Sequence, residues 1–242
     1  MLIEFGLLVL GAYLMGSVPA AYLAAKLSRG IDIRRYGDAN VGATNLLRLT
    51  SVWVALPVII FDIGKGLIMV LAAQLVGLDI VQQVTVGLAA IVGHNWPVFL
   101  RFKGGRGILT SLGVITILVP WIGLIVFLIA YGLAPFHQLA FGVLLSVIAA
   151  PTSAWFFSQP LGVADKLPIT LGFLAIFLIV IFRRLTAPRT SLTASVPLGQ
   201  LLVNRLLFDR DIRDREAWIH HASGEASKTN SKKSQGKVDS VK

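Results

Sequence analysis

Residues 32–48 read D-I-R-R-Y-G-D-A-N-V-G-A-T-N-L-L-R and lie between two long apolar runs. The stretch concentrates charged residues, Gly, Asn and Thr in a chain that is otherwise strongly apolar. Two further polar segments, residues 62–66 and residues 94–107, interrupt the apolar sequence in a related way. We expect the first loop to form the floor of a functional site that the other two segments complete.

The composition indicates a membrane protein. Of 242 residues, 55% are hydrophobic and 14% are charged, with a mean hydropathy of +0.77, whereas a soluble domain carries about a quarter charged residues. The absence of cysteine excludes disulfides, a thiol nucleophile and a zinc–thiolate site. A net charge of +10 would suit a nucleic-acid-binding protein. Basic cytoplasmic loops and a basic tail explain it in a membrane protein, so we expect no nucleic-acid partner.

Several apolar segments are long enough, or nearly so, for helices that cross about 30 Å of hydrocarbon. They span residues 5–27, 52–77, 80–100, 107–134, 138–157 and 168–182. Lys and Arg in short loops mark the cytoplasmic side, and the region after the first segment is rich in them. This places that loop in the cytoplasm and the N-terminus outside. If residues 107–134 formed one helix, the basic C-terminal region would then lie outside.

A helix break at Pro120 resolves this conflict. Proline removes a backbone donor and disfavours helical geometry at the preceding residue, so we predict two short segments that meet at residues 119–121. The predicted fold is all-α: a polytopic membrane protein with seven transmembrane helices, the N-terminus outside and the C-terminus cytoplasmic. Residues 107–118 are short for a full crossing, so that segment needs shielding by its neighbours or a thinned bilayer.

The sequence divides into three parts. Residues 1–184 form the membrane-embedded domain, and residues 185–221 form a cytoplasmic segment. Within it, apolar residues alternate with Asp and Arg over residues 197–219, which predicts an amphipathic helix that either lies on the membrane or docks against the protein. Residues 222–242 are dominated by Ser, Lys, Gly and Asn and are expected to be disordered.

Asp62 and Lys65 lie in the middle of the second apolar run. An ionisable residue at membrane depth is unfavourable unless it faces a partner or a wet cavity. A spacing of three puts both side chains on one helix face, so they can pair with each other. The pair either serves helix packing alone or organises the polar loop beside it. Gly64 and Gly66 flank the lysine and permit close helix approach.

Residues 101–107 read R-F-K-G-G-R-G and open into a helix. Glycines let backbone N–H groups turn toward a ligand, and a helix N-terminus adds its dipole, so the loop suits a phosphate. The alternative is a basic cytoplasmic turn that only obeys topology. His94, just before this loop, is either a hydrogen-bonded structural residue or a base. The other histidines lie elsewhere in the chain, so we expect no metal site.

The first loop offers short polar side chains between two membrane helices. Asn40, Thr44 and Asn45 can orient a head group or donate to an oxyanion, and Arg48 can bind a phosphate through two nitrogens. Asx turns and helix capping would explain some of the Asn and Thr. With seven crossings, all three polar segments face the same side and offer many cations and few acids. The expected ligand is a phosphorylated molecule, with a lipid substrate arriving through the bilayer.

Four motifs carry a resemblance to a known family. They are G-S-V-P at 16–19, D-I-R-x-x-G-x-x-N-x-G-A-T-N-x-x-R at 32–48, D-x-x-K-G at 62–66 and G-H-x-x-P-V-F-x-x-F-K-G-G-x-G at 93–107. In this order they resemble the bacterial acyl-phosphate-dependent glycerol-3-phosphate acyltransferases. The resemblance implies an integral membrane enzyme with seven crossings and no cofactor. It implies transfer of a fatty acyl group from acyl phosphate to the 1-position of sn-glycerol 3-phosphate, which gives lysophosphatidic acid and phosphate.

The chain departs from the family pattern at three places. Asp38 stands where the family has a serine, and a carboxylate repels a phosphate unless it is paired or protonated. It would hold Arg34, Arg35 or Arg106, or serve as a base for the glycerol hydroxyl. Arg106 itself replaces a lysine. In the third motif, Arg-Arg at 183–184 stands for Arg-His, and the nearest Asn-Arg-Leu follows some twenty residues later, at 204–206.

These observations define the candidate site. The candidate catalytic residues are Asp38, Asn40, Asn45 and His94. The candidate substrate-binding residues are Arg34, Gly42, Thr44, Arg48, Lys65, Lys103, Gly104, Gly105 and Arg106. The expected partners are acyl phosphate, glycerol 3-phosphate and the lipid bilayer, in a multi-pass protein of the cell membrane whose site faces the cytoplasm.

Two other functions stay open. Asp38 and the altered third motif would fit a diverged paralogue that acylates another acceptor. The charged pair at membrane depth and the broken fourth segment would fit a non-enzymatic protein that binds or transports an anion.

Overall fold

The structure is a computed structural model that describes residues 2–163, 165–187, 196–215 and 217–218. These residues form helices and turns and contain no strand. The longer helices are α1 (Leu2–Ser17), α4 (Val52–Leu75), α5 (Ile80–Asn95), α8 (Leu139–Phe156) and α9 (Lys166–Leu185). The shorter ones are α2 (Ala20–Arg29), α3 (Ala43–Leu49), α6 (Ile108–Leu118), α7 (Pro120–Gly132) and α10 (Leu198–Phe208). Three 3-10 turns are η1 (Ile33–Arg35), η2 (Val98–Leu100) and η3 (Ala134–Phe136).

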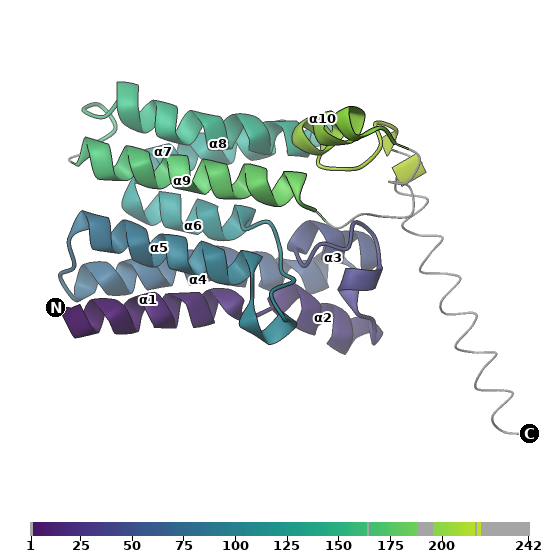
Figure 1. Ribbon diagram of the computed structural model, residues 1–242, viewed down its shortest axis with the longest axis horizontal. Coiled ribbons are helices and arrows are strands. Elements are labelled where there is room, and N and C mark those ends of the chain that lie inside the picture. The colour runs from purple at the N-terminus through teal and green to yellow at the C-terminus, as the bar shows by residue number, and fades with distance from the viewer. Residues whose placement is uncertain (1, 164, 188–195, 216, 219–242) are drawn as a thin grey trace, which may run out of the picture.

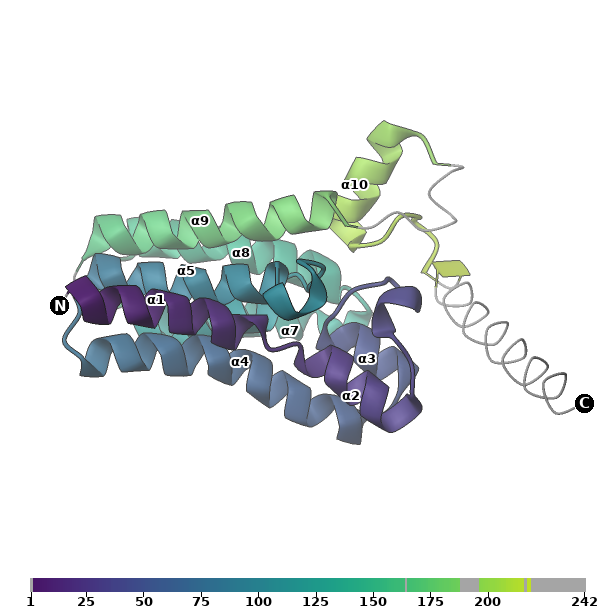
Figure 2. The same cartoon turned by 60° about the horizontal axis from the view of Figure 1, so that its bottom comes forward.

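The helices form one elongated bundle. Helices α1 and α4 to α9 lie side by side along its long axis (Figure 1), with α1 against α5, α4 against α6 and α8 against both α7 and α9. The short helices α2, α3 and α10 gather at the end opposite the N-terminus (Figures 1 and 2). The loops that carry the polar segments therefore meet at one end of the bundle.

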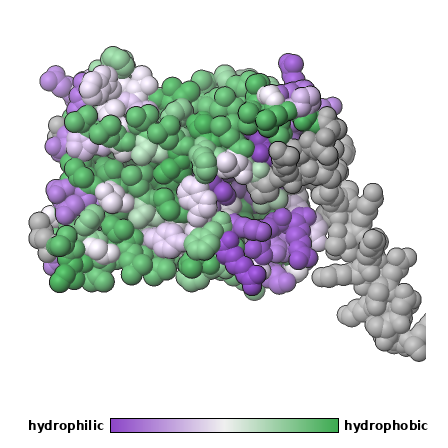
Figure 3. Space-filling view, viewed as in Figure 1, coloured by the Kyte–Doolittle hydropathy of each residue, from purple (hydrophilic) through white to green (hydrophobic). Residues whose placement is uncertain are grey.

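The sides of the bundle are apolar, as a lipid-facing surface must be. Figure 3 shows hydrophobic residues along the flank and hydrophilic residues gathered toward the two ends. Within the described residues, four helical stretches are long and apolar enough to cross a membrane: Leu2–Arg29, Val52–Leu75, Leu139–Phe156 and Lys166–Leu185. The predicted all-α membrane fold is confirmed.

The predicted break at Pro120 is present. Helix α6 ends at Leu118, Val119 is extended (φ −144°, ψ 92°), and α7 begins at Pro120. Proline tolerates the first helical position because its missing N–H has no helical partner there. The first apolar segment, expected as one run over residues 5–27, is instead divided between α1 and α2 by Pro19. The physical reason is the same, since proline disfavours helix at the residue before it.

Glycines bring the helices that carry the polar segments into close contact. A Cβ on Gly16 would collide with the Ala90 carbonyl across the α1–α5 contact, and one on Gly66 would collide with the Thr110 carbonyl between α4 and α6. Such small-residue contacts are typical of membrane helices, which associate by van der Waals packing. The expected close approach at Gly66 is confirmed, whereas Gly64 has only a distant side-chain neighbour.

The predicted amphipathic helix over residues 197–219 is shorter in the structure: α10 ends at Phe208, and residues 209–214 are not helical because the chain turns at the left-handed Asp209. Helix α10 packs against α8 and α9 through the buried residues Leu201, Asn204 and Arg205, while Leu198 and Val203 are exposed. Of the two alternatives, docking against the protein therefore accounts for the buried face of α10. The last part of the predicted helix, residue 219, and the predicted tail, residues 222–242, lie outside the described residues.

Candidate active site

Asn45 holds the first loop in shape. Its Nδ2 donates to the carbonyl oxygens of Tyr36 (3.0 Å), Asn40 (3.1 Å) and Ile33 (3.5 Å), and the residue is fully buried. Gly37 has a left-handed φ of 65°, and a Cβ there would collide with the Asn45 side chain. Asn45, expected to be catalytic, thus points into the loop that it closes, and its visible role is to position that loop.

Arg34 is paired inside the same loop. Its Nε and Nη2 donate to the two carboxylate oxygens of Asp32 at 2.9 and 2.7 Å, and its guanidinium lies over the Tyr22 ring. The Arg34 hydrogen bond lowers the pKa of Asp32 below its usual value, although partial burial opposes the shift. Arg34 was expected to bind substrate, but its contacts do not bring it to the cations around Asp38.

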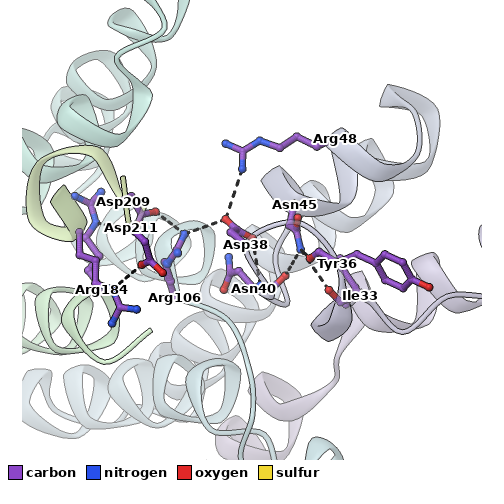
Figure 4. A network of polar contacts seen from close by, with 11 residues as sticks. Ile33, Tyr36, Asp38, Asn40, Asn45, Arg48, Arg106, Arg184, Asp209 and Asp211 are labelled. Carbon is purple, nitrogen blue, oxygen red and sulfur yellow. Dashed lines mark hydrogen bonds and ion pairs between the residues drawn. The ribbon is translucent and has the colours of Figure 1, made fainter. Parts of the chain in front are cut away.

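Asp38 is the point on which two cations converge. Its carboxylate is buried, with Oδ2 at 3.6 Å from Arg48 Nη1 and 3.4 Å from Arg106 Nη1. Its other oxygen accepts the Asn40 backbone N–H at 3.2 Å, which makes an Asx turn. Figure 4 shows the carboxylate between the two arginines. The acid that departs from the expected motif is therefore paired, and Arg106 is one of the partners expected for it.

Arg106 also reaches a carboxylate that the sequence did not point to. Its Nη1 lies 2.5 Å from Asp209 Oδ2, just beyond α10. Burial lowers the pKa of Arg106, but the Asp209 and Asp38 carboxylates raise it more, so the net shift is upward. Burial raises the pKa of Asp209, and Arg106 and Arg184 only partly oppose this. Arg106 remains a cation that two acids hold in place.

The glycine loop, residues 101–107 before α6, is held by hydrogen bonds from two sides. The carbonyl oxygens of Gly105 and Gly104 accept from Arg183 Nε at 3.0 Å and Nη2 at 3.1 Å. On the other side, the Gly105 N–H donates to the His94 carbonyl at 3.1 Å, so this N–H does not turn toward a ligand as expected. A Cβ on Gly105 would collide with the His94 ring. The two glycines allow the loop to lie directly on His94.

Beneath the glycine loop lies the buried charged cluster, formed by Asp62, Lys65 and His94. The predicted Asp62–Lys65 pair is present, with 2.8 Å between Nζ and Oδ1. Lys65 Nζ also lies 3.1 Å from the Gly16 carbonyl oxygen and 2.7 Å from His94 Nδ1. An ammonium has only donors, so Nδ1 accepts. Lys65 was expected to bind substrate and His94 to be catalytic. In the structure they contact each other beneath the loop, and His94 also lines a small cavity together with Asp62 and Gly104.

The other expected residues lie on the first loop, at the start of α3 and in the loop before α6. Gly42 is the N-cap of α3, with the exposed Thr44 in its first turn. The Asn40 side chain lies against Gly42 and is half-buried. Lys103 is exposed at the start of the glycine loop. These polar groups and Arg48, which is 43% exposed in its side chain, are accessible to a ligand.

Sequence reasoning missed three contributors to this site. Arg183 and Arg184 end α9 and were interpreted only as the altered third motif; Arg183 orients the glycine loop, and Arg184 Nε lies 3.8 Å from Asp209 Oδ1. Asp209 was missed because it lies 103 residues after Arg106 in the chain. The one available signal was the late Asn-Arg-Leu at 204–206, which marks the helix that brings Asp209 to the site.

Comparisons with known proteins place the chain in a family. The family model described as glycerol-3-phosphate acyltransferase matches residues 6–190. The chain belongs to the glycerol-3-phosphate acyltransferase family. This confirms the resemblance expected from the motifs.

Relatives and solved structures agree with this membership. Glycerol-3-phosphate acyltransferase 4 of Dehalococcoides mccartyi (strain CBDB1) is 45% identical over 216 residues, which cover 89% of this chain and 93% of the relative. A glycerol-3-phosphate acyltransferase of Halalkalibacterium halodurans is 40% identical over 62% of this chain and 77% of its own length. A crystal structure of PlsY (YgiH), an integral membrane glycerol 3-phosphate acyltransferase in its glycerol 3-phosphate form, has a TM-score of 0.69 at 30% identity, covering 87% of this chain and 96% of that one.

The side chains that meet around Asp38 and Arg106 do not all come from the region that the family model matches. Asp38, Arg48, Arg106 and Arg184 lie inside the residues that the family model matches, whereas Asp209 lies beyond its last matched residue, 190. The C-terminal segment therefore contributes a contact to the site from outside the matched region.

Proposed function

We propose that the protein transfers an acyl group from acyl phosphate to the 1-position of sn-glycerol 3-phosphate, which yields lysophosphatidic acid and phosphate for phospholipid biosynthesis. The observation that carries the proposal is the family match over residues 6–190, together with relatives that bear the name glycerol-3-phosphate acyltransferase. The solved PlsY structure in its lysophosphatidic acid form, 28% identical with a TM-score of 0.67, fits the same product.

The end cluster, which we define as Asp38, Arg48, Arg106, Arg184 and Asp209, supports binding of phosphorylated substrates. Arg48 is partly exposed, and the contacts that anchor Arg106 among the described residues all involve Nη1. Both can add bonds to a phosphate, since guanidinium presents five donors in a fork. Lys103 supplies a further exposed cation nearby in sequence. We assign these three cations to substrate phosphates, and the accessible Thr44 and Asn40 to orientation of the acceptor.

The reaction requires positioning more than covalent catalysis. The hydroxyl oxygen of glycerol 3-phosphate attacks the acyl carbonyl carbon, the carbonyl carbon–phosphate oxygen bond breaks, and inorganic phosphate leaves. The hydroxyl proton passes to a phosphate oxygen of the departing group, so no protein nucleophile is needed. Residues that align the two substrates and stabilise the developing negative charge then provide the acceleration.

We further propose seven crossings in the cell membrane, with the N-terminus outside and the site and C-terminus facing the cytoplasm. The charge distribution supports this orientation. The end that holds α2, α3 and α10 carries most of the cations, whereas the other end has the acidic residues Asp79 and Asp165 and the single cation Lys166 among its described turns. Lys and Arg concentrate on the cytoplasmic side of membrane proteins.

The test uses purified full-length protein in detergent. It is expected to release phosphate from palmitoyl phosphate only when glycerol 3-phosphate is present, with lysophosphatidic acid formed in equal amount. Absence of release with acyl phosphates of every chain length would refute the proposal. Counterflow of labelled glycerol 3-phosphate in proteoliposomes, without acylated product, would instead identify a transporter.

The two acids that pair with Arg106 motivate a second candidate function, in which the enzyme acylates another acceptor. Asp38 and Asp209 both pair with Arg106, and Asp38 departs from the motif that the resemblance led us to expect. A diverged enzyme with another acceptor would fit such a site. Competition by other phosphorylated polyols and by neutral polyols separates the two functions: preference for glycerol 3-phosphate supports the first, and preference for another polyol supports the diverged enzyme.

A further inference from the structure

The end cluster contains a carboxylate from outside the region that the family model matches. Asp209 Oδ2 lies 2.5 Å from Arg106 Nη1, while Asp38 Oδ2 lies 3.4 Å from the same nitrogen. We propose that Asp209 is a positioning residue for Arg106, so that residues 198–211 form part of the active site. The proposal rests on the proposed acyl transfer to glycerol 3-phosphate and assigns the C-terminal segment a role in binding its phosphate.

The C-terminal segment is fastened to the bundle by two reciprocal bonds. Arg184 Nη1 donates to the Leu206 carbonyl at 2.8 Å, and Arg205 Nη1 donates to the Leu185 carbonyl at 2.9 Å. Each arginine thus caps a carbonyl near the end of the other helix, which the end of a helix leaves without a helical partner. Both arginines are buried. The end of α10 is therefore held against the end of α9.

Two further hydrogen bonds shape the turn that follows α10. Arg205 Nε donates to Asp211 Oδ1 at 2.8 Å, and Asn204 Nδ2 donates to the Asp211 carbonyl at 3.1 Å. Between them, Asp209 has a left-handed backbone (φ 56°), which is uncommon for a residue with a side chain although Asp tolerates it better than most. The chain thus reverses at Asp209, and the turn directs its carboxylate back toward Arg106 (Figure 4).

The contacts that hold Arg106 leave some of its guanidinium nitrogens available to a ligand. Both carboxylates contact Nη1, whereas Nε and Nη2 make no hydrogen bond within the described part of the chain. A long arginine side chain loses much rotamer freedom when it binds a ligand. Two acids that fix it beforehand reduce that loss and aim the remaining donors. Asp38, Arg106 and Asp209 line a small cavity, and a phosphate oxygen that enters it would meet an already oriented guanidinium.

The experiment is a double-mutant cycle on the full-length protein, with the dependence of phosphate release on glycerol 3-phosphate as the readout. The variants are Asp209→Ala, Arg106→Ala and both together, with Asp165→Ala as the matched control. Asp165 is an exposed carboxylate at the opposite end of α9 from Arg184. Asp209→Asn keeps an oxygen that can accept from Nη1 and serves as the conservative variant. Thermal unfolding of each variant monitors the fold.

We expect Asp209→Ala to raise KM for glycerol 3-phosphate about tenfold, with a smaller change in kcat, because one charge-assisted hydrogen bond on Arg106 is lost. Asp209→Asn recovers part of this, and Asp165→Ala behaves as wild type. In the Arg106→Ala background, Asp209→Ala adds little, since its partner is already absent. Loss of active protein at unchanged KM, or additive effects in the cycle, would show that Asp209 only stabilises the fold.

A fall in KM for Asp209→Ala would also overturn the proposal, because it would mean that the carboxylate competes with the substrate phosphate. If Asp209→Ala does not fold, the same cycle is run with Asp209→Asn, for which a rise of a few-fold in KM that vanishes in the Arg106→Ala background is expected. Wild-type protein without any release that depends on glycerol 3-phosphate would refute the proposed function itself. Active wild type with unaltered Asp209 variants would refute only the role of Asp209.

Discussion

The buried charged cluster and the end cluster are built in opposite ways. In the first, Asp62 and Lys65 pair one turn apart on α4, and the lysine directs its donors to Asp62, Gly16 and His94. In the second, Asp38, Arg106 and Asp209 come from three distant segments, and Arg48 remains partly exposed. All three side chains of the first cluster are buried, and their contacts with one another support the structure. The second cluster includes Arg48, whose side chain is exposed enough to exchange protein contacts for ligand contacts.

The largest effect is expected from a variant that disrupts the buried charged cluster. Lys65→Met would leave the Asp62 carboxylate buried without its cation, and removing one partner of a buried pair destabilises a protein by about 3–5 kcal/mol. We expect little folded protein after purification and a strongly lowered unfolding temperature. The double variant Asp62→Asn with Lys65→Met is expected to recover part of the stability. Equal stability of Lys65→Met and wild type would contradict the assignment of this cluster to structure.

The second prediction concerns the contact between the two clusters. Gly105→Ala would place a methyl group against the His94 ring and the Val41 carbonyl, which forces the glycine loop and Arg106 away from their positions. A displacement of about 1 Å can lower a rate about 100-fold, so we expect a loss of that order in kcat/KM. Gly64→Ala is the control, because a Cβ there meets only a side-chain methyl at 3.9 Å. Similar activities of the two variants would show that the loop tolerates displacement.

The third prediction tests whether Arg48 binds substrate or stabilises the fold. Arg48→Ala removes a partly exposed cation from the end cluster, and we expect KM for glycerol 3-phosphate to rise about tenfold, as for loss of a charge-assisted hydrogen bond. Its unfolding temperature should stay close to that of wild type. Arg29→Ala, at the exposed end of α2, controls for general loss of positive charge. A marked loss of stability without a change in KM would place Arg48 with the structural residues.

The smallest expected effect lies in the Asp32–Arg34 pair, outside both clusters. The Arg34 hydrogen bond holds the pKa of Asp32 below its usual value of 3.8, so the pair stabilises the fold above that value and loses its contribution as the pH falls through the lowered pKa. Because both side chains are partly exposed to solvent, we expect less than about 1 kcal/mol. Unfolding temperatures of wild type and Asp32→Asn, measured between pH 3 and 6, should differ near pH 6 and converge toward pH 3. A constant difference would exclude this linkage.

Much of the fold was predictable because it depends on local properties. A long apolar run must form a helix in a bilayer, since backbone N–H and C=O groups find no other partners there. Proline disfavours helical geometry at the residue before it, which predicted the break at Pro120 but was overlooked at Pro19. Proline alone does not decide a break, since Pro57 and Pro151 lie inside α4 and α8. The Asp62–Lys65 pair followed from helical periodicity alone. The candidate residues Arg34, Asn45 and His94 lie at the end of the bundle where the polar segments meet, and their contacts in the structure are with neighbouring loops.

What the sequence by itself determined is the class of molecule: a membrane helix bundle, three polar segments at its basic end, and motifs that resemble one acyltransferase family. Only the tertiary structure decided which of those polar groups meet. Arg183 contacts glycine carbonyls 78 and 79 residues away, and Asp209 contacts Arg106 across 103 residues. Such contacts depend on how α9 and α10 pack against the rest of the bundle. The spacing of residues along the chain constrains neighbours within a helix, but it does not constrain partners that only packing brings together.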